Sequence, residues 1–93
     1  MKKFTEYVVV YDITANGERT KIARLLKGYG FRIQKSVFQC RLTRAWNREL
    51  IEKIEKLGIK TGFVRIYRLD YSSRKTDIGQ EAPNKDDGCA YIV

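Results

Sequence analysis

The run Tyr7-Val8-Val9-Val10-Tyr11 is the feature that most constrains the fold of this 93-residue chain. Five consecutive β-branched or aromatic residues predict a strand covered on both faces, because a half-exposed strand would alternate apolar with polar residues. The run ends at Asp12, and residues 13–17 have the composition of a turn and a helix start. Asp12 is therefore either a binding carboxylate held by rigid backbone at a sheet rim, or only the residue that opens the turn.

The charge of the chain is large and unevenly distributed. The net charge of +8 favours a polyanionic partner. Residues 1–76 contain 18 Lys or Arg against 7 Asp or Glu, a balance of +11, whereas residues 77–93 contain 1 against 4, a balance of −3. A basic body with an acidic end suggests that this end folds back on the body or pairs with another subunit.

Residue content also narrows the possible chemistry. The chain has two cysteines, Cys40 and Cys89, and no histidine. Two cysteines without metal-ligand spacing argue against a disulfide framework or a zinc site and fit a reducing, cytoplasmic environment. The longest apolar run is too short to span a bilayer and no signal-peptide pattern opens the chain, so we expect no membrane partner. Without histidine, catalysis must rest on carboxylates, metal-bound water, lysine or tyrosine.

An amphipathic helix is predicted over about residues 17–29. Its apolar stripe is formed by Ile22, Leu25, Leu26 and Tyr29. We expect Asn16 as the N-cap and Gly30 as the residue that follows the helix end. The remaining face carries charges that are usually only solvated: Arg19, Lys21, Arg24 and Lys27. Arg19 lies in the first turn, where the helix dipole disfavours a cation. Because a cation is unfavourable there and the turn of Asp12 is adjacent, we favour a functional role for Arg19.

Residues 31–42 change phase, which predicts two strands instead of one. The apolar positions are first odd and then even: Phe31 and Ile33, then Phe38, Cys40 and Leu42. Because strand side chains alternate strictly, the change requires a turn or bulge near Lys35 and Ser36.

A second helix is predicted to begin after Thr43, which can cap it, and to end at Gly58. Its expected core face is Trp46, Leu50, Ile51, Ile54 and Leu57. The pairs Glu49–Lys53 and Glu52–Lys56 have the favourable i, i+4 order, so the outer face is expected to be structural.

The remaining chain predicts a fourth strand and a C-terminal part. The strand covers about residues 62–69, with Val64 and Ile66 on one face and Phe63, Arg65 and Tyr67 on the other. We divide the chain into a core domain of residues 1–71 and a polar connection with a terminal strand in residues 72–93. Apolar termini are rarely left in water, so residues 89–93 should pair with a sheet edge of their own chain or of a partner.

The element order β-α-β-β-α-β predicts an α+β, ferredoxin-like fold with an additional C-terminal strand. Both helices are expected on one face of the sheet. Tyr7, Val9 and Tyr11 compete with Val8 and Val10 for the side that faces the helices. If the first strand is apolar on both faces, a second copy of the sheet would cover the open face most economically. The pattern therefore predicts a homodimer that packs sheet to sheet.

Two motifs resemble a known family when they occur together. Tyr11-Asp12-Ile13 ends the first strand, and Arg32-Ile33-Gln34-Lys35-Ser36-Val37-Phe38 follows downstream, with Arg19 and Lys21 between them. This combination resembles the Cas-two family of small CRISPR-associated spacer-acquisition proteins over about residues 5–70. The resemblance implies a ferredoxin-like homodimer in which the C-terminal strand crosses to the partner. It also implies a Mg²⁺ ion, or another divalent metal, between the two Asp12 carboxylates.

The resemblance further implies roles for individual residues. Asp12 would be the metal ligand and the catalytic residue. Its local support would come from Tyr11, Ser36 and Phe38. Phosphates of RNA or duplex DNA would be contacted by Arg19, Lys21 and Arg32. Lys21 stands where some family members have arginine, which weakens a bidentate phosphate contact there.

Three classes of function fit these residues. A metal-dependent endonuclease would use Mg²⁺ on Asp12 to lower the pKa of a bound water. A scaffold would bind DNA phosphates and, as the resemblance implies, bridge dimers of the larger integrase Cas-one without catalysis. A sheet-face RNA reader needs an RNP1 pattern on the third strand, and only Gly62-Phe63-Val64 on the fourth strand is similar to it. We interpret the chain as an endonuclease with an adaptor role in a CRISPR integration complex.

Overall fold

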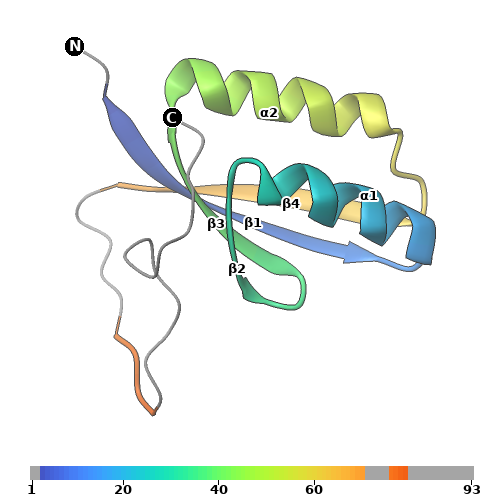
Figure 1. Cartoon of the computed structure of the whole chain (residues 1–93), viewed down its shortest axis with the longest axis horizontal. Coiled ribbons are helices and arrows are strands. Elements are labelled where there is room, and N and C mark those ends of the chain that lie inside the picture. Colours follow the sequence, from blue (N-terminus) through green and yellow to red (C-terminus); the bar gives the residue numbers. More distant parts are fainter. Residues whose placement is uncertain (1–2, 71–75, 80–93) are drawn as a thin grey trace.

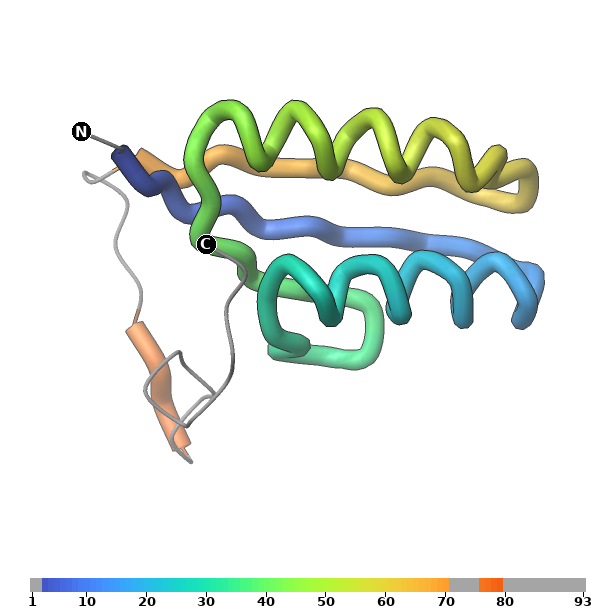
Figure 2. Tube along the Cα trace, turned by 45° about the horizontal axis from the view of Figure 1, so that its top comes forward, coloured from blue at the N-terminus to red at the C-terminus, as the bar shows by residue number. Residues whose placement is uncertain are grey.

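The computed structural model describes residues 3–70 and 76–79. The elements along these residues are β1 (Phe4–Ile13), α1 (Asn16–Lys27), β2 (Gly30–Gln34), β3 (Val37–Thr43), α2 (Arg44–Leu57) and β4 (Gly62–Leu69). The strands form one antiparallel sheet in the order β2-β3-β1-β4, and both helices lie on the same side of it (Figures 1 and 2). The predicted α+β, ferredoxin-like fold is confirmed. The predicted terminal strand at residues 89–93 lies outside the described residues.

Strand β1 alternates between the two sides of the sheet. Tyr7, Val9, Tyr11 and Ile13 are buried under the helices, whereas Val8 and Val10 are half-buried on the other side and Asp12 is exposed there. We call this second side the open face. It contains Glu6, Val8, Val10 and Asp12 of β1 and their cross-strand neighbours Val37, Gln39, Arg41, Phe63, Arg65, Tyr67 and Leu69. Among the described residues, the helices thus cover the apolar run of β1 on one side only.

Helix α1 packs its apolar stripe onto the covered side of the sheet. Ile22 and Leu26 are fully buried. The predicted N-cap is wrong: Ala15 holds that position without a side-chain cap, and Asn16 is already helical. Ala15 is held instead through its own backbone, because Ala15 N donates to Thr61 Oγ1, 2.9 Å away.

The predicted residue after the helix end is also wrong, because the helix is capped by Gly28 and Gly30 is the first residue of β2. Gly30 lets β2 approach β3 closely. A Cβ at this position would overlap the carbonyl oxygen of Gln39 and lie 2.7 Å from Cys40 Sγ.

Strands β2 and β3 form a hairpin whose turn is Lys35-Ser36, as the change of phase predicts. The register of the pair shifts between Arg32 and Gln34, where a bulge accommodates the change. Phe38, Cys40 and Leu42 of β3 are then fully buried.

Helix α2 has the predicted ends. Thr43 Oγ1 accepts a hydrogen bond from Trp46 N over 3.1 Å, and Gly58 has the left-handed backbone conformation, with φ of 65°. Leu50 is fully buried, but the prediction that Ile51 belongs to the core is wrong, because its side chain is 38% exposed. Adjacent helical residues point about 100° apart, and here Leu50 faces the core while Ile51 points away from it. Neither helix of the described residues is long and apolar enough to cross a membrane.

We expect Gly30→Ala to destabilise the fold by about 1–3 kcal/mol, the usual cost of overpacking a core. The added methyl would overlap the Gln39 backbone, so β2 or β3 would have to move. Gly17→Ala is the matched control, because a methyl there meets nothing within 4 Å and alanine is favoured in a helix. Urea unfolding at one protein concentration measures both changes. Equal stability of Gly30→Ala and the parent protein would contradict the close packing of β2 on β3.

Candidate functional site

Asp12 is the penultimate residue of β1 and lies on the open face, where it is exposed. Its cross-strand neighbour on β4 is Phe63, whose side chain is 47% exposed. No described residue forms a hydrogen bond or ion pair with the Asp12 carboxylate. The backbone is tightly held, because a Cβ at Gly62 would overlap the Asp12 carbonyl oxygen. The site therefore combines a fixed backbone with a carboxylate that no described residue binds.

The turn after Asp12 is held by the loop between α2 and β4. Thr14 N donates to Thr61 O over 3.0 Å. Glu18 Oε2 accepts from Lys60 N over 2.9 Å, and Glu18 Oε1 accepts from Thr61 N and Oγ1 over 3.0 and 2.6 Å. The Thr61 hydroxyl, together with these backbone donors, lowers the pKa of Glu18. Glu18 and Thr61 thus join the start of α1 to the start of β4.

Arg19 closes the same turn from the other side. Its Nη1 donates to Ile13 O over 2.9 Å and to Thr14 O over 2.7 Å. These two carbonyls compensate the unfavourable position of a cation in the first turn of a helix. Because a guanidinium carries five N–H donors and Nη1 supplies only two, Arg19 keeps donors for a ligand.

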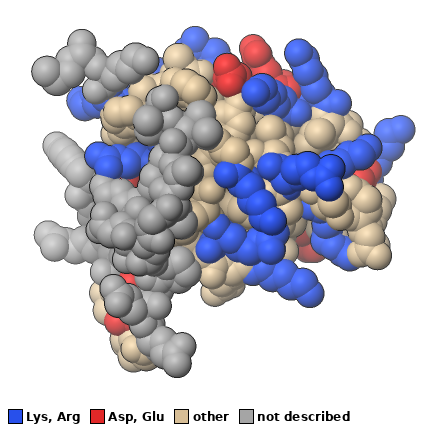
Figure 3. Space-filling model, in the orientation of Figure 1, with Lys and Arg blue, Asp and Glu red and all other residues tan. Residues whose placement is uncertain are grey.

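A groove with a volume of about 400 Å³ lies between α1 and the β2–β3 turn. We call it the basic groove. Its lining residues are Tyr11, Asn16, Arg19, Thr20, Ala23, Arg24, Lys27, Arg32, Lys35 and Ser36. Five of these residues are Lys or Arg and none is Asp or Glu. Figure 3 shows Lys and Arg side chains gathered over α1 and the neighbouring turn. The groove is therefore suited to an anionic ligand.

Aromatic packing on Phe38 positions two lining residues of the basic groove, Tyr11 and Arg32. The rings of Tyr11 and Phe38 stack with centroids 6.4 Å apart, and the guanidinium of Arg32 lies 5.1 Å from the centroid of the Phe38 ring. Tyr11 N donates to Ser36 O over 3.1 Å, and Tyr11 OH donates to Lys35 O over 3.2 Å. Tyr11, Ser36 and Phe38 therefore hold the β2–β3 turn in place on the helix side of the sheet, and Asp12 is on the other side.

The structure brings some of the predicted site residues together and separates others. Arg19 and Arg32 line one groove, whereas Lys21 is exposed outside it. Sequence reasoning missed three further cations of the groove, which are Arg24, Lys27 and Lys35. The lining residues of α1 do follow helical spacing, in the rows 16, 20, 24 and 19, 23, 27. This spacing could have identified Arg24 and Lys27 as groove residues. Using it would have required knowing that the β2–β3 turn faces this side of α1.

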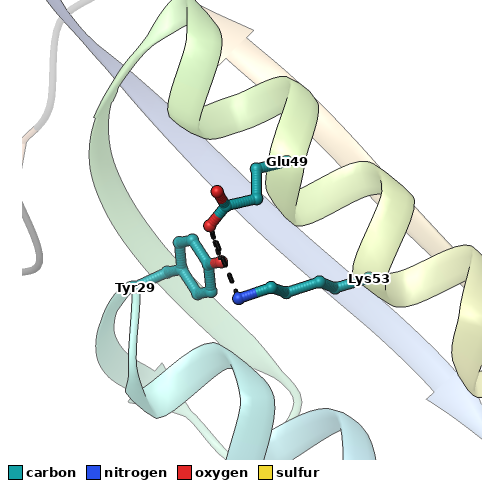
Figure 4. Close-up of polar contacts among 3 residues, drawn as sticks. All are labelled: Tyr29, Glu49 and Lys53. Carbon is teal, nitrogen blue, oxygen red and sulfur yellow. Dashed lines mark hydrogen bonds and ion pairs between the residues drawn. The ribbon is translucent and has the colours of Figure 1, made fainter.

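A second cluster of titratable side chains lies outside the groove, where α2 meets the loop after α1 (Figure 4). Tyr29 OH donates to Glu49 Oε2 over 2.7 Å, and Lys53 Nζ lies 3.4 Å from the same oxygen, as predicted for the Glu49–Lys53 pair. Trp46 packs edge-on against Tyr29. Burial raises the pKa of Tyr29, and the bond from its hydroxyl lowers the pKa of Glu49. Near neutral pH the Tyr29 hydroxyl is thus protonated and the Glu49 carboxyl ionised, and their bond joins α2 to the loop between α1 and β2.

The side chains that could hold a metal ion are few among the described residues. They contain no group of three or more Asp, Glu, Cys or His side chains that could hold an ion. On the open face, Asp12 offers a carboxylate that no described residue binds. Mg²⁺ commonly binds one or two carboxylates and keeps several waters, so this donor fits Mg²⁺ when water or a second chain completes the coordination.

Comparisons with known proteins point to one family. Residues 5–77 match the family model described as CRISPR associated protein Cas2. The CRISPR-associated endoribonuclease Cas2 1 of Chloroflexus aurantiacus is 40% identical over 91 residues, which cover 94% of this chain and 98% of the relative. The CRISPR-associated endoribonuclease Cas2 of Mycobacterium tuberculosis H37Rv is 36% identical over 62 residues, or 67% of this chain. That match spans only 55% of the length of the M. tuberculosis relative.

Solved structures have the same fold. The hypothetical protein TT1823 from Thermus thermophilus superposes with a TM-score of 0.75 at 31% identity, over 88% of this chain and 98% of that one. A chain of the structure described as a partial Cas6-RT-Cas1–Cas2 complex superposes with a TM-score of 0.70 at 30% identity, over 80% of this chain and 84% of that one.

We expect Glu18→Gln to weaken the acid dependence of stability. Since the pKa of Glu18 is lower in the folded protein than its ordinary value of 4.5, the carboxylate stabilises the fold above about pH 4.5, and this contribution is lost as the pH falls through the lowered value. The variant should therefore unfold more easily than the parent at neutral pH, and the difference should shrink at about pH 3.

Urea midpoints at the two pH values measure this effect. Glu52→Gln removes an exposed carboxylate from α2 and is the control. A difference between Glu18→Gln and the parent that is the same at both pH values would contradict the role of the Glu18 charge.

Proposed function

This chain belongs to the CRISPR-associated Cas2 family, and we propose that it acts in spacer acquisition as a nucleic-acid-binding, metal-dependent endonuclease. Related proteins are named endoribonucleases or endonucleases, and one similar structure is a complex of Cas1 and Cas2. The observation that carries the proposal is Asp12, a free carboxylate on fixed backbone at the end of a central strand. The substrate is a phosphodiester of RNA or DNA.

Asp12 is the proposed ligand of a divalent metal ion. When bound, Mg²⁺ would supply a water of lowered pKa and would neutralise charge that develops on the phosphate. The chain itself positions the Asp12 carboxylate. Pairing with β4 holds the Asp12 backbone, and Arg19 bonds to the carbonyls of the two residues that follow Asp12. Arg19, Lys21 and Arg32 are the proposed phosphate contacts, and they lower the cost of bringing a polyanion to the protein.

We propose that the open face is the interface of a homodimer. Phe63 and Tyr67 are 47% and 48% exposed in one chain, beside half-buried Val8 and Val10. Stable homodimer interfaces of this apolar kind bury roughly 2,000 Å² or more. Since Asp12 lies on the same face, a two-fold axis there would bring two carboxylates together. Two such carboxylates repel each other unless a cation lies between them, which favours a shared metal ion.

The other candidate functions differ in their support. A non-catalytic scaffold that binds an integrase of the Cas1 type uses the same basic surface, and we propose this partner because a similar chain occurs in a complex with Cas1. A cytoplasmic location fits a chain with two cysteines and this family. A sheet-face RNA reader would stack bases on aromatic side chains of the central strands. There the structure places Val8 and Val10 of β1 and Gln39 of β3, which disfavours that function.

Asp12→Asn is expected to reduce metal-dependent cleavage by about 100-fold or more, because it removes the charge of the ligand. Asparagine is a good turn residue, so folding and dimerisation should persist. Cleavage of RNA and of duplex DNA with and without Mg²⁺ is the measurement. Asp77→Asn, at an exposed aspartate, is the control. An Asp12→Asn protein that cleaves like the parent would reduce Asp12 to a turn residue. If both proteins bind nucleic acid and neither cleaves it, the function is that of a scaffold.

Val8→Glu is expected to raise the dissociation constant of the dimer by more than about 100-fold, because a charge at a dry interface costs several kcal/mol. Val8 lies in the middle of the open face, opposite Gln39 and Tyr67. Ile51→Glu is the control, since it places the same charge on an exposed apolar position of α2. Analytical ultracentrifugation at micromolar concentration distinguishes the two. Unchanged association of Val8→Glu would show that the open face is not the interface.

A further inference from the structure

The basic groove and the Asp12 carboxylate lie on opposite sides of the sheet. Neighbouring residues of a strand point to opposite faces, and Tyr11 is buried on the helix side, where it lines the groove. Arg32 is on the helix side as well, in register with the buried Phe38 and stacked on its ring. A ligand that fills the groove is therefore separated from Asp12 of the same chain by the thickness of the sheet.

The cations of the groove are spread along its two walls. One wall is a face of α1 that runs from Arg19 through Arg24 to Lys27, a distance of about 12 Å at 1.5 Å per helical residue. The other wall carries Arg32 and Lys35 at the β2–β3 turn. This length is several times the axial advance per nucleotide of one duplex strand, about 3.4 Å, so the groove is long enough to contact more than one phosphate.

This arrangement suits a polymer better than a small anion. A single phosphate could contact only one or two of five cations that are spread over about 12 Å. Four of the five, all except Arg19, are exposed, as expected for contacts with a solvated backbone. Arg19 is part of both regions, because its Nη1 holds the carbonyls after Asp12 while its side chain lines the groove.

We infer that the basic groove binds the sugar–phosphate backbone of a nucleic acid on the side of the sheet opposite Asp12. The contacts are Arg24, Lys27 and Lys35, in addition to Arg19 and Arg32. The inference rests on the proposed function in taking nucleic acid as the ligand. Backbone contacts carry no base readout, so binding is independent of sequence. It also requires no metal, and a strand in the groove is not positioned for attack at Asp12 of the same chain.

The test compares two double variants that remove the same charge. R24Q/K27Q changes exposed residues at the end of α1 that line the groove, and R48Q/K56Q changes exposed residues of α2 outside it. Binding to a duplex DNA of mixed sequence is measured between about 50 and 200 mM salt in EDTA. For R24Q/K27Q, the slope of log K against log salt should become about 1.8 less steep per bound chain, or about 1.4 for single-stranded RNA. R48Q/K56Q should change it by less than half as much.

The outcomes separate this inference from the proposed function. Equal losses in the two double variants would show diffuse attraction and overturn the groove, while nucleic-acid binding and cleavage by the parent would keep the proposed function. The parent should bind the duplex in EDTA, and binding that requires Mg²⁺ would overturn the separation of the basic groove from Asp12. A titration with inorganic phosphate alone tests the simpler ligand. Saturable phosphate binding in the groove, with unchanged duplex binding by R24Q/K27Q, would also overturn the inference. A parent protein that binds no nucleic acid would contradict both the inference and the proposed function.

Discussion

The rest of the structure depends on the position of β1 in the middle of the sheet. Hydrogen bonds to β3 on one side and β4 on the other leave β1 no freedom of register, so its odd and even side chains are assigned to opposite faces along its whole length. The odd residues enter the core, where Val9 is fully buried. The even residues form the open face and end at Asp12. A slip of one residue would place Asp12 in the core and Tyr11 in solvent, so the same pairing that stabilises the core also exposes the carboxylate.

The end of β1 is held by segments that are far apart in the sequence. Glu18 and Arg19 of α1 bond to the loop before β4 and to the carbonyls after Asp12, respectively, and Thr61 bonds to both Thr14 and Glu18. Most of these bonds are at the surface, where each contributes modestly to stability. Their common effect is positional: they fix the backbone that carries Asp12 and the first turn of α1 that carries Arg19. A carboxylate and a guanidinium are thereby held a few residues apart on different sides of one sheet.

Two surfaces result from this arrangement, and they differ in physical character. The open face combines valines and exposed aromatic rings with charged residues, among them Asp12, and we propose that it packs on a second copy of the sheet. The helix side is basic, with a groove in which charges from α1 and the β2–β3 turn face a shared space. Because the sheet separates the surfaces, the proposed subunit contact and the proposed polyanion contact do not compete for the same side of the chain.

The sequence by itself determined the elements and much of the proposed site. Periodicity, the Thr43 cap, Gly58 and the change of phase near Lys35 are local signals, and the structure agrees with each of them. The Tyr-Asp-Ile and Arg-Ile-Gln-Lys-Ser-Val-Phe motifs indicated the family. Only the tertiary structure decided which side of β1 faces the helices, because an unbroken apolar run has no period. It also decided that Ile51 is exposed, that Ala15 and not Asn16 is the N-cap residue, and that Arg24 and Lys27 share a groove with Lys35. These outcomes depend on contacts between distant segments, which no local pattern encodes.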